Sequence, residues 1–221
     1  MAEGNVIYDV ATWLVPLVFA IVLHEISHGW VANAFGDPTA RDLGRLSPNP
    51  IRHVDPIGTV ALPMVLAVSG APVFGWAKPV PVDSRKLRNP RLHMMLVALA
   101  GPGMNFLLAL AAAFGLTLAR AAEAAPFLVD NLGNFLVINL FLGVFNLLPV
   151  PPFDGGHIVE GLLPRPLVPA WKRIGRLGFP LLILLLVVVP LVFPQANVIE
   201  KLVVPPVTAL LRVYGGLAGL A

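Results

Sequence analysis

The sequence predicts an all-α polytopic membrane protein with about five transmembrane helices, plus a re-entrant or membrane-associated loop with short β-strand segments. Three observations favour this class: 57% of the 221 residues are hydrophobic, only 12% are charged, and the mean hydropathy is +0.82. Soluble globular domains are roughly 25% charged, and disordered chains combine low hydrophobicity with high charge. The composition therefore excludes both of those classes.

Five apolar runs are long enough to cross a bilayer, which requires about 20 mostly apolar residues per helix. We expect the spans at residues 10–31, 92–119, 126–149, 174–192 and 197–214. The last run carries Glu200 and Lys201, so the sequence leaves open whether it crosses the membrane. A sixth apolar segment, residues 57–76, is interrupted by Pro63, Gly70 and Pro72.

The basic residues indicate the orientation of the chain. Twelve of the fifteen Lys and Arg residues fall within residues 32–56, 77–91 and 150–176. By the positive-inside rule these segments are cytoplasmic and the N-terminus lies outside. Because residues 57–76 connect two cytoplasmic segments, we expect them to enter and leave on one side as a re-entrant or interfacial loop. The basic residues thus serve as topology signals, and no nucleic-acid partner is expected.

The first predicted span contains an ionisable motif, His24-Glu25-Ile26-Ser27-His28, which fits H-E-x-x-H. Residues four apart share one face of a helix, so both imidazoles can reach one ion with Glu25 beside them. This is the arrangement of zinc bound by two histidines with a carboxylate base. A buried polar cluster that only fixes helix packing is the structural alternative.

A catalytic zinc usually has three protein ligands, and the chain contains no cysteine. Asp154 is the other acidic residue in apolar surroundings beside a span, and it follows Pro149, Pro151 and Pro152, which break the helix. With one spanning helix between them, the first and third long helices run parallel. We therefore expect Asp154 at the depth of His24 and His28.

The chain resembles the site-2 proteases, a family of intramembrane zinc metalloproteases. The resemblance rests on three motifs within residues 10–163: His24-Glu25-x-x-His28, Gly101-Pro102-x-x-Asn105, and Asn146-x-x-Pro149-x-x-x-x-Asp154-Gly155. It implies a catalytic core at residues 1–163, which includes the loop at 57–76 and a strand-like segment at 75–82. Residues 164–221 would form C-terminal transmembrane helices. No PDZ-like or other regulatory domain is recognised, so we expect a minimal form.

The resemblance also implies roles for individual residues. His24, His28 and Asp154 would ligate one zinc ion, Glu25 would activate water, and Asn146 would help to stabilise the oxyanion. Substrates would be transmembrane helices of other proteins, cut within or near the bilayer of a prokaryotic cell membrane, with the active site toward the cytoplasm. An unwound substrate would pair with a segment made of Gly75, Trp76, Ala77, Lys78, Pro79 and Val80.

Two other functions fit the residues less well. A metal-ion transporter would use the same His/Asp site for an ion in transit, but a relay of further intramembrane acids is missing from the sequence. An inactive membrane scaffold would not require the complete motif. Among the remaining polar residues, His157 could compete as a ligand, Asn105 could be catalytic or a packing residue, and His53, His93 and Glu160 are expected to lie at interfaces or in loops.

Overall fold

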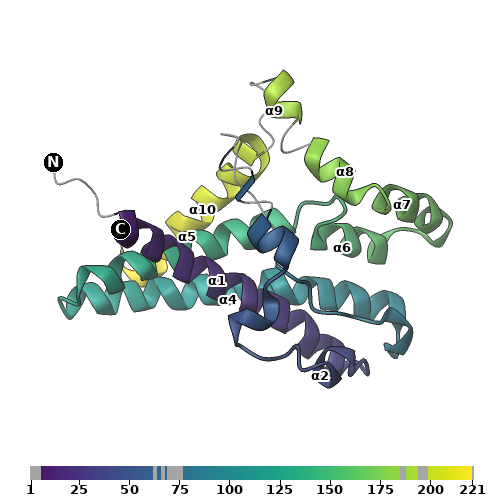
Figure 1. Ribbon diagram of the computed structural model, residues 1–221, viewed down its shortest axis with the longest axis horizontal. Coiled ribbons are helices and arrows are strands. Elements are labelled where there is room, and N and C mark those ends of the chain that lie inside the picture. The colour runs from purple at the N-terminus through teal and green to yellow at the C-terminus, as the bar shows by residue number, and fades with distance from the viewer. Residues whose placement is uncertain are drawn as a thin grey trace.

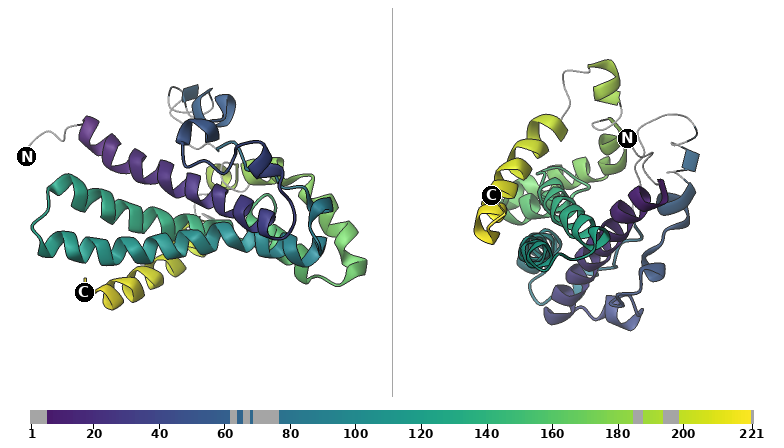
Figure 2. Two further views of the ribbon diagram at one scale, coloured as in Figure 1. Left: turned by 90° about the horizontal axis from the view of Figure 1, so that it is seen from below. Right: turned by 90° about the vertical axis from the view of Figure 1, so that its left-hand side faces the viewer.

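Three long helices form the centre of the molecule. The structure is a computed structural model that describes residues 6–61, 64–65, 68, 77–184, 188–193 and 199–220. Within these residues α1 (Val6–Ala34), α4 (Pro90–Ala121) and α5 (Pro126–Asn146) pack side by side, as Figures 1 and 2 show. Each is long and apolar enough to cross a membrane. The all-α class is therefore confirmed for the described residues, which contain no β-strand.

Shorter elements are attached to this three-helix bundle. In Figure 1, α6 and α7 lie near the end of the bundle opposite the turn between α4 and α5, while α10 lies along the bundle beside α5. These elements are α2 (Thr39–Asp42), η1 (Pro50–His53), η2 (Pro56–Ala61), η3 (Ser84–Lys86), α6 (Asp154–Leu162), η4 (Arg165–Leu167), α7 (Val168–Gly175), α8 (Gly178–Ile183), α9 (Val189–Val192), η7 (Ile199–Val203) and α10 (Val204–Ala218).

The ends of the long helices follow from local chemistry. α4 starts at Pro90, whose missing N–H costs nothing at that position, and the Asn89 side chain accepts a hydrogen bond from the amide of Leu92. α1 ends shortly before Gly36, whose φ of +109° is readily adopted only by glycine. α5 also starts at a proline, Pro126, and it ends before the proline-rich segment 149–152, which cannot continue a helix.

The direction of the helices brings distant motifs to one end of the bundle. Near the start of α1, the Tyr8 hydroxyl donates to Asp130 Oδ2 at 2.7 Å, and the Asn134 amide donates to Thr12 O at 2.9 Å. The positions of the partners increase together along α1 and α5, so these two helices are parallel. The predicted parallel arrangement is therefore present, and α4 runs antiparallel between them.

Several predicted features are not confirmed. Among the described residues, α8 and α9 cover part of 174–192, while η7 and α10 follow one another directly over 199–218; neither region is among the three candidate spans. Most of the predicted loop at residues 57–76 lies outside the described residues, as do Gly75 and Trp76 of the predicted strand-like segment. Residues 77–82 have neither helical nor strand structure. The membrane orientation and the division at residue 163 stay predictions.

The parallel packing of α1 and α5 can be tested by cross-linking, because the chain has no native cysteine. We expect a Thr12→Cys/Asn134→Cys variant to form an intramolecular cross-link with a short bismaleimide. In the control pair, Thr12→Cys/Asn146→Cys, the second cysteine lies twelve residues further along α5, about 18 Å away. Cross-linking of the control pair in preference to the first, read by mass spectrometry, would contradict the parallel arrangement.

Candidate metal centre

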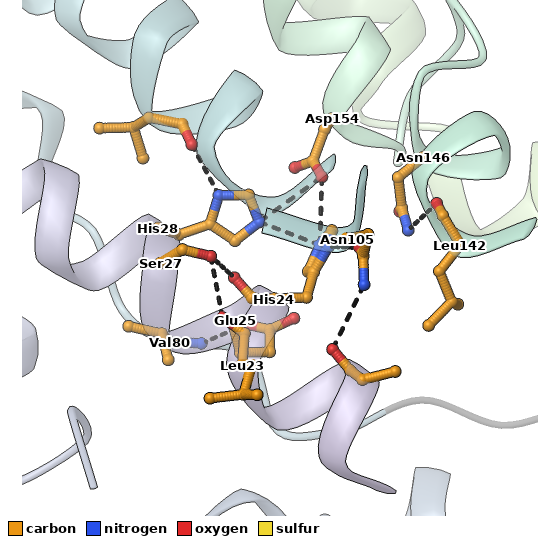
Figure 3. A network of polar contacts seen from close by, with 12 residues as sticks. Leu23, His24, Glu25, Ser27, His28, Val80, Asn105, Leu142, Asn146 and Asp154 are labelled. Atoms are coloured by element: carbon orange, nitrogen blue, oxygen red, sulfur yellow. Dashed lines mark hydrogen bonds and ion pairs between the residues drawn. The ribbon is translucent and has the colours of Figure 1, made fainter. Parts of the chain in front are cut away.

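Two imidazoles and one carboxylate converge at the junction of α1 and α6. His24 and His28 lie one turn apart on α1 and are both buried, and Asp154 is the first residue of α6. The Nε2 atoms of His24 and His28 are 3.1 Å apart. Asp154 Oδ2 lies 3.3 Å from Nε2 of His24 and 3.5 Å from Nε2 of His28. Figure 3 shows the three side chains pointing toward one another. The three predicted ligands are therefore brought together.

Hydrogen bonds on the far side of each ring define which nitrogen carries the proton. His28 Nδ1 lies 2.7 Å from the backbone oxygen of Val97, and His24 Nδ1 lies 2.6 Å from Asn105 Oδ1. A backbone carbonyl oxygen and a side-chain amide oxygen can only accept hydrogen bonds, so both Nδ1 atoms donate. Each neutral ring then directs an Nε2 lone pair toward the other ring and toward Asp154.

These lone pairs fit a bound cation. Among the described residues Asp154 Oδ2 is a buried oxygen without a hydrogen-bond partner, although it lies close to both rings. Zinc binds nitrogen and oxygen ligands at about 2.0–2.2 Å in tetrahedral geometry, which places neighbouring ligand atoms about 3.3 Å apart. The observed separations of 3.1, 3.3 and 3.5 Å match this value. Two histidines and a carboxylate also form a known catalytic donor set, with a fourth position open.

A glycine allows α4 to approach the two rings. A Cβ atom on Gly101 would lie 2.5 Å from His24 Cε1 and 2.5 Å from His28 Nε2. Two residues further along the same helix, a Cβ atom on Gly103 would meet nothing within 4 Å. The first glycine of the Gly-Pro-x-x-Asn motif is therefore required by the close packing of α4 against the imidazoles.

Glu25 lies beside the imidazoles and contacts the segment at residues 77–82. Its Oε2 atom accepts a hydrogen bond from the amide of Val80 at 2.8 Å. Pro79 and Pro81 have no N–H, so Val80 supplies the one backbone donor between them. The isopropyl group of Val80 is buried, and a Cβ atom on Gly29 of α1 would come within 2.9 Å of it.

Other groups hold this segment in place. The amide of Lys78 donates to His53 O at 2.8 Å, and the Arg45 guanidinium donates to the carbonyl oxygens of Lys78 and Pro79 at 2.7 and 3.3 Å. The segment is therefore fixed against the loop that follows α1, with its Val80 amide directed at Glu25.

The buried carboxylate of Asp37 is a second anchor. It accepts hydrogen bonds from the amide and hydroxyl of Thr39 and, at 2.6 Å, from the amide of Asp83 just beyond the segment. Burial alone would raise the pKa of Asp37, but these hydrogen bonds outweigh burial and lower the pKa below its usual value. Asp37 thus stays ionised near neutral pH and ties the end of α1 to the segment.

A cavity of about 1130 Å³ opens beside the three converging side chains. Glu25, Val80, Asn146 and His157 contribute to its wall, together with residues of α6 and α7. Asn146 lies at the end of α5, where its amide donates to Leu142 O at 3.0 Å, as Figure 3 shows. One further N–H of that amide group is available for a ligand in the cavity.

The remaining candidates do not join the group of three. His157 is exposed at the cavity wall, and Glu160 pairs with Lys172 at 3.3 Å. His53 is buried, with Nε2 2.9 Å from Ser47 O, and the ring of His93 stacks on Phe35. Asn105 makes both kinds of contact: its Oδ1 lies 2.6 Å from His24 Nδ1, and its amide donates to Asn139 of α5 at 2.8 Å.

Sequence reasoning missed several groups that shape the site. Arg45 and Asp37 lie in a polar loop where such residues are ordinary, and Val97 acts through its backbone, so none carries a side-chain signal. Asn139 of α5, which accepts a hydrogen bond from Asn105 at 2.8 Å, could have been found, because a polar side chain in an apolar span needs a partner.

Comparisons with known proteins agree on one family. The family model described as "Peptidase family M50" matches residues 12–130 and 117–188. The chain is 40% identical over 184 residues to "Putative zinc metalloprotease YwhC" of Bacillus subtilis (strain 168), covering 80% of each chain. It is 31% identical over 195 residues to "Putative zinc metalloprotease Rip2" of Mycolicibacterium smegmatis, covering 88% of this chain and 70% of the relative. No solved structure matches.

Because Gly101 packs against the imidazoles and Gly103 does not, we expect alanine substitutions at these two positions to have different effects on stability and zinc binding. We expect Gly101→Ala to displace the rings and to cost about 1–3 kcal/mol of stability, as overpacking generally does, and to weaken zinc binding. Gly103→Ala, with open space around it, serves as the control: zinc binding should be unchanged, and stability should not fall, since alanine is favoured over glycine in a helix by about 0.5–1 kcal/mol. Thermal unfolding and a chelator competition for zinc measure the two effects, and equal behaviour of the two variants would contradict the packing argument.

Proposed function

The chain belongs to peptidase family M50 and is a zinc metalloprotease, and we propose that it hydrolyses peptide bonds within or near the transmembrane helices of other membrane proteins. The observation that carries this proposal is the convergence of His24, His28 and Asp154 beside a cavity among apolar helices. Ionisable side chains are costly inside a membrane span and are expected there mainly for function.

We assign the three converging side chains as the protein ligands of one zinc ion. When bound there, zinc would supply a Lewis acid that lowers the pKa of a coordinated water to about 7. The chain's own contribution is to direct two Nε2 lone pairs and a carboxylate oxygen at one point. The Nδ1–H bonds to Asn105 and to Val97 O hold the rings in that orientation.

Glu25 is the proposed general base. Because its Oε2 atom accepts the Val80 amide, Oε1 is left to take a proton from water and return it to the leaving amine. The amide group of Asn146, on the cavity wall, is the proposed donor to the carbonyl oxygen as negative charge develops on it.

Residues 75–80 are the proposed substrate-binding segment, of which Gly75 and Trp76 lie outside the described residues. A helical substrate hides its carbonyl groups in hydrogen bonds and must unwind before it can be cut. Contact with an extended backbone beside Glu25 would offset part of that cost. Since Pro79 and Pro81 donate nothing and the Val80 N–H is hydrogen-bonded to Glu25, the pairing would depend on carbonyl acceptors of the segment.

A multi-pass membrane protein is consistent with the three long apolar helices. We propose that it lies in a prokaryotic cell membrane, with the N-terminus outside and the metal centre toward the cytoplasm. The basic segments at residues 32–56, 77–91 and 150–176 support this orientation.

The role of Glu25 predicts a separation of metal binding from catalysis. We expect Glu25→Gln to retain about wild-type zinc content but to lower the cleavage rate by about 10²–10⁴-fold, since the amide cannot accept the proton. Cleavage of a model transmembrane substrate in proteoliposomes, with zinc content measured on the same sample, tests both parts. Cleavage at the wild-type rate would exclude Glu25 as the base, and ion flux without cleavage in the wild type would indicate a transporter.

The Val80 amide can be removed by a single substitution. We expect Val80→Pro to lower the cleavage rate by about tenfold or more, because a charged-acceptor hydrogen bond worth about 1.5–3 kcal/mol to Glu25 is lost. Val80→Ala also loses the isopropyl packing but keeps the N–H, so it is the matched control. Equal rates for the two variants would show that packing, and not the amide, explains the effect.

A further inference from the structure

Two asparagines are fully buried in the long helices, next to the metal centre. Asn105 of α4 and Asn139 of α5 each have 0% exposure. Asn105 Nδ2 donates to Asn139 Oδ1 at 2.8 Å, and Asn105 Oδ1 accepts from His24 Nδ1 at 2.6 Å. A chain of hydrogen bonds thus joins α5, α4 and α1 and ends on a proposed zinc ligand.

We propose that Asn139 is a positioning residue that sets the tautomer of His24 through Asn105. The inference rests on the proposed zinc site and adds a residue to it that touches neither the metal position nor the cavity. Asn139 acts by selecting the orientation of the Asn105 amide, and Asn105 in turn selects which nitrogen of His24 carries the proton.

The donor and acceptor directions in this series of hydrogen bonds follow from one group that can only accept, the backbone oxygen of Phe135. Asn139 Nδ2 donates to the backbone oxygen of Phe135 at 2.8 Å, and a carbonyl oxygen can only accept. Asn139 must therefore present Oδ1 to Asn105. That oxygen requires Nδ2 of Asn105 in front of it, which leaves Asn105 Oδ1 to face His24. The amide of Asn105 also points toward Ala20 O at 3.4 Å, which supports the same orientation.

The opposite orientation would be incompatible with a metal ligand. If Asn105 presented its NH₂ group to His24, Nδ1 would have to accept and Nε2 would carry the proton. That proton would point at His28 Nε2 and Asp154 Oδ2, where the lone pair is needed. Partners that orient a ligating histidine typically contribute 10–100-fold to metal affinity. Asn139 does not touch His24 itself, but its Oδ1 lies 2.8 Å from the Asn105 amide nitrogen, whereas the other acceptor of that amide, Ala20 O, lies at 3.4 Å.

The test compares two asparagines on the same helix. Asn134, five residues before Asn139, also joins α5 to α1 through a side-chain amide, but it bonds to Thr12 O and is not part of the chain to His24. We expect Asn139→Leu to raise the dissociation constant for zinc by about 10–100-fold. Asn134→Leu, with the same change in chemistry, should leave that constant within about twofold of wild type. Chelator competition on the purified full chain measures both.

A rescue variant separates positioning from packing. In Asn105→Asp both oxygens accept, so His24 Nδ1–H finds an acceptor whichever way the group is turned. Because Asn139 Oδ1 would then face a carboxylate oxygen, we expect Asn139→Leu not to lower zinc affinity in the Asn105→Asp background. If Asn139 acted only by packing, Asn139→Leu would lower zinc affinity by the same factor in the wild-type and Asn105→Asp backgrounds.

A spectroscopic measurement requires no variant at position 139. The ¹⁵N shifts of His24 in the zinc-loaded wild type, assigned by comparison with His24→Ala, should show Nε2 on the metal and a slowly exchanging proton on Nδ1. Metal on Nδ1 would overturn the inference, as would equal zinc affinities of the Asn139→Leu and Asn134→Leu variants. Wild-type protein that binds no zinc would overturn the proposed function as well.

Discussion

The structure depends on bringing three lone pairs from separate parts of the chain to one point inside an apolar bundle. Two come from α1 and one from the start of α6, within 3.5 Å of one another. Each of these side chains is held in place by contacts with the surrounding helices. Gly101 lets α4 approach the rings, Asn105 and Val97 fix their rotation, and the proline-broken segment after α5 returns the chain so that Asp154 faces them.

The same bundle explains how polar groups are tolerated in apolar helices. Backbone and side-chain polar groups in a membrane must find partners inside the protein. Asn105 and Asn139 do so across helices, and Asn134 reaches the backbone of α1. These contacts lie along the faces where α1, α4 and α5 meet, while residues such as Leu107 and Leu118 of α4 are exposed. Polar contacts inside and apolar side chains outside are the arrangement that a bilayer requires.

The sequence was sufficient for much of the site and for part of the fold. The spacing of His24 and His28 is a property of one helix, and Asp154 could be paired with them because the charge pattern predicted that α1 and α5 run parallel. Hydropathy located α1, α4 and α5 to within a few residues. It also predicted two spans near the C-terminus, which are not among the three candidate spans found in the described residues.

Other features were out of reach for physical reasons. The contact of Glu25 with Val80 is made by a backbone amide 55 positions away, and a backbone donor has no residue-type signature. The predicted strand-like segment has no strand structure where it is described, and its alternate prolines lack the N–H donors that a continuous ladder needs.

Those alternate prolines also bear on how the protein behaves in a crowded membrane. An extended backbone with free donors and acceptors at its edge is a template for association between identical chains, and proline is one of the means by which proteins prevent it. With Pro79 and Pro81 on either side of Val80, two copies of this segment cannot zip together into a continuous ladder. The segment proposed to bind substrate is thereby protected against ladder formation with a second copy of itself.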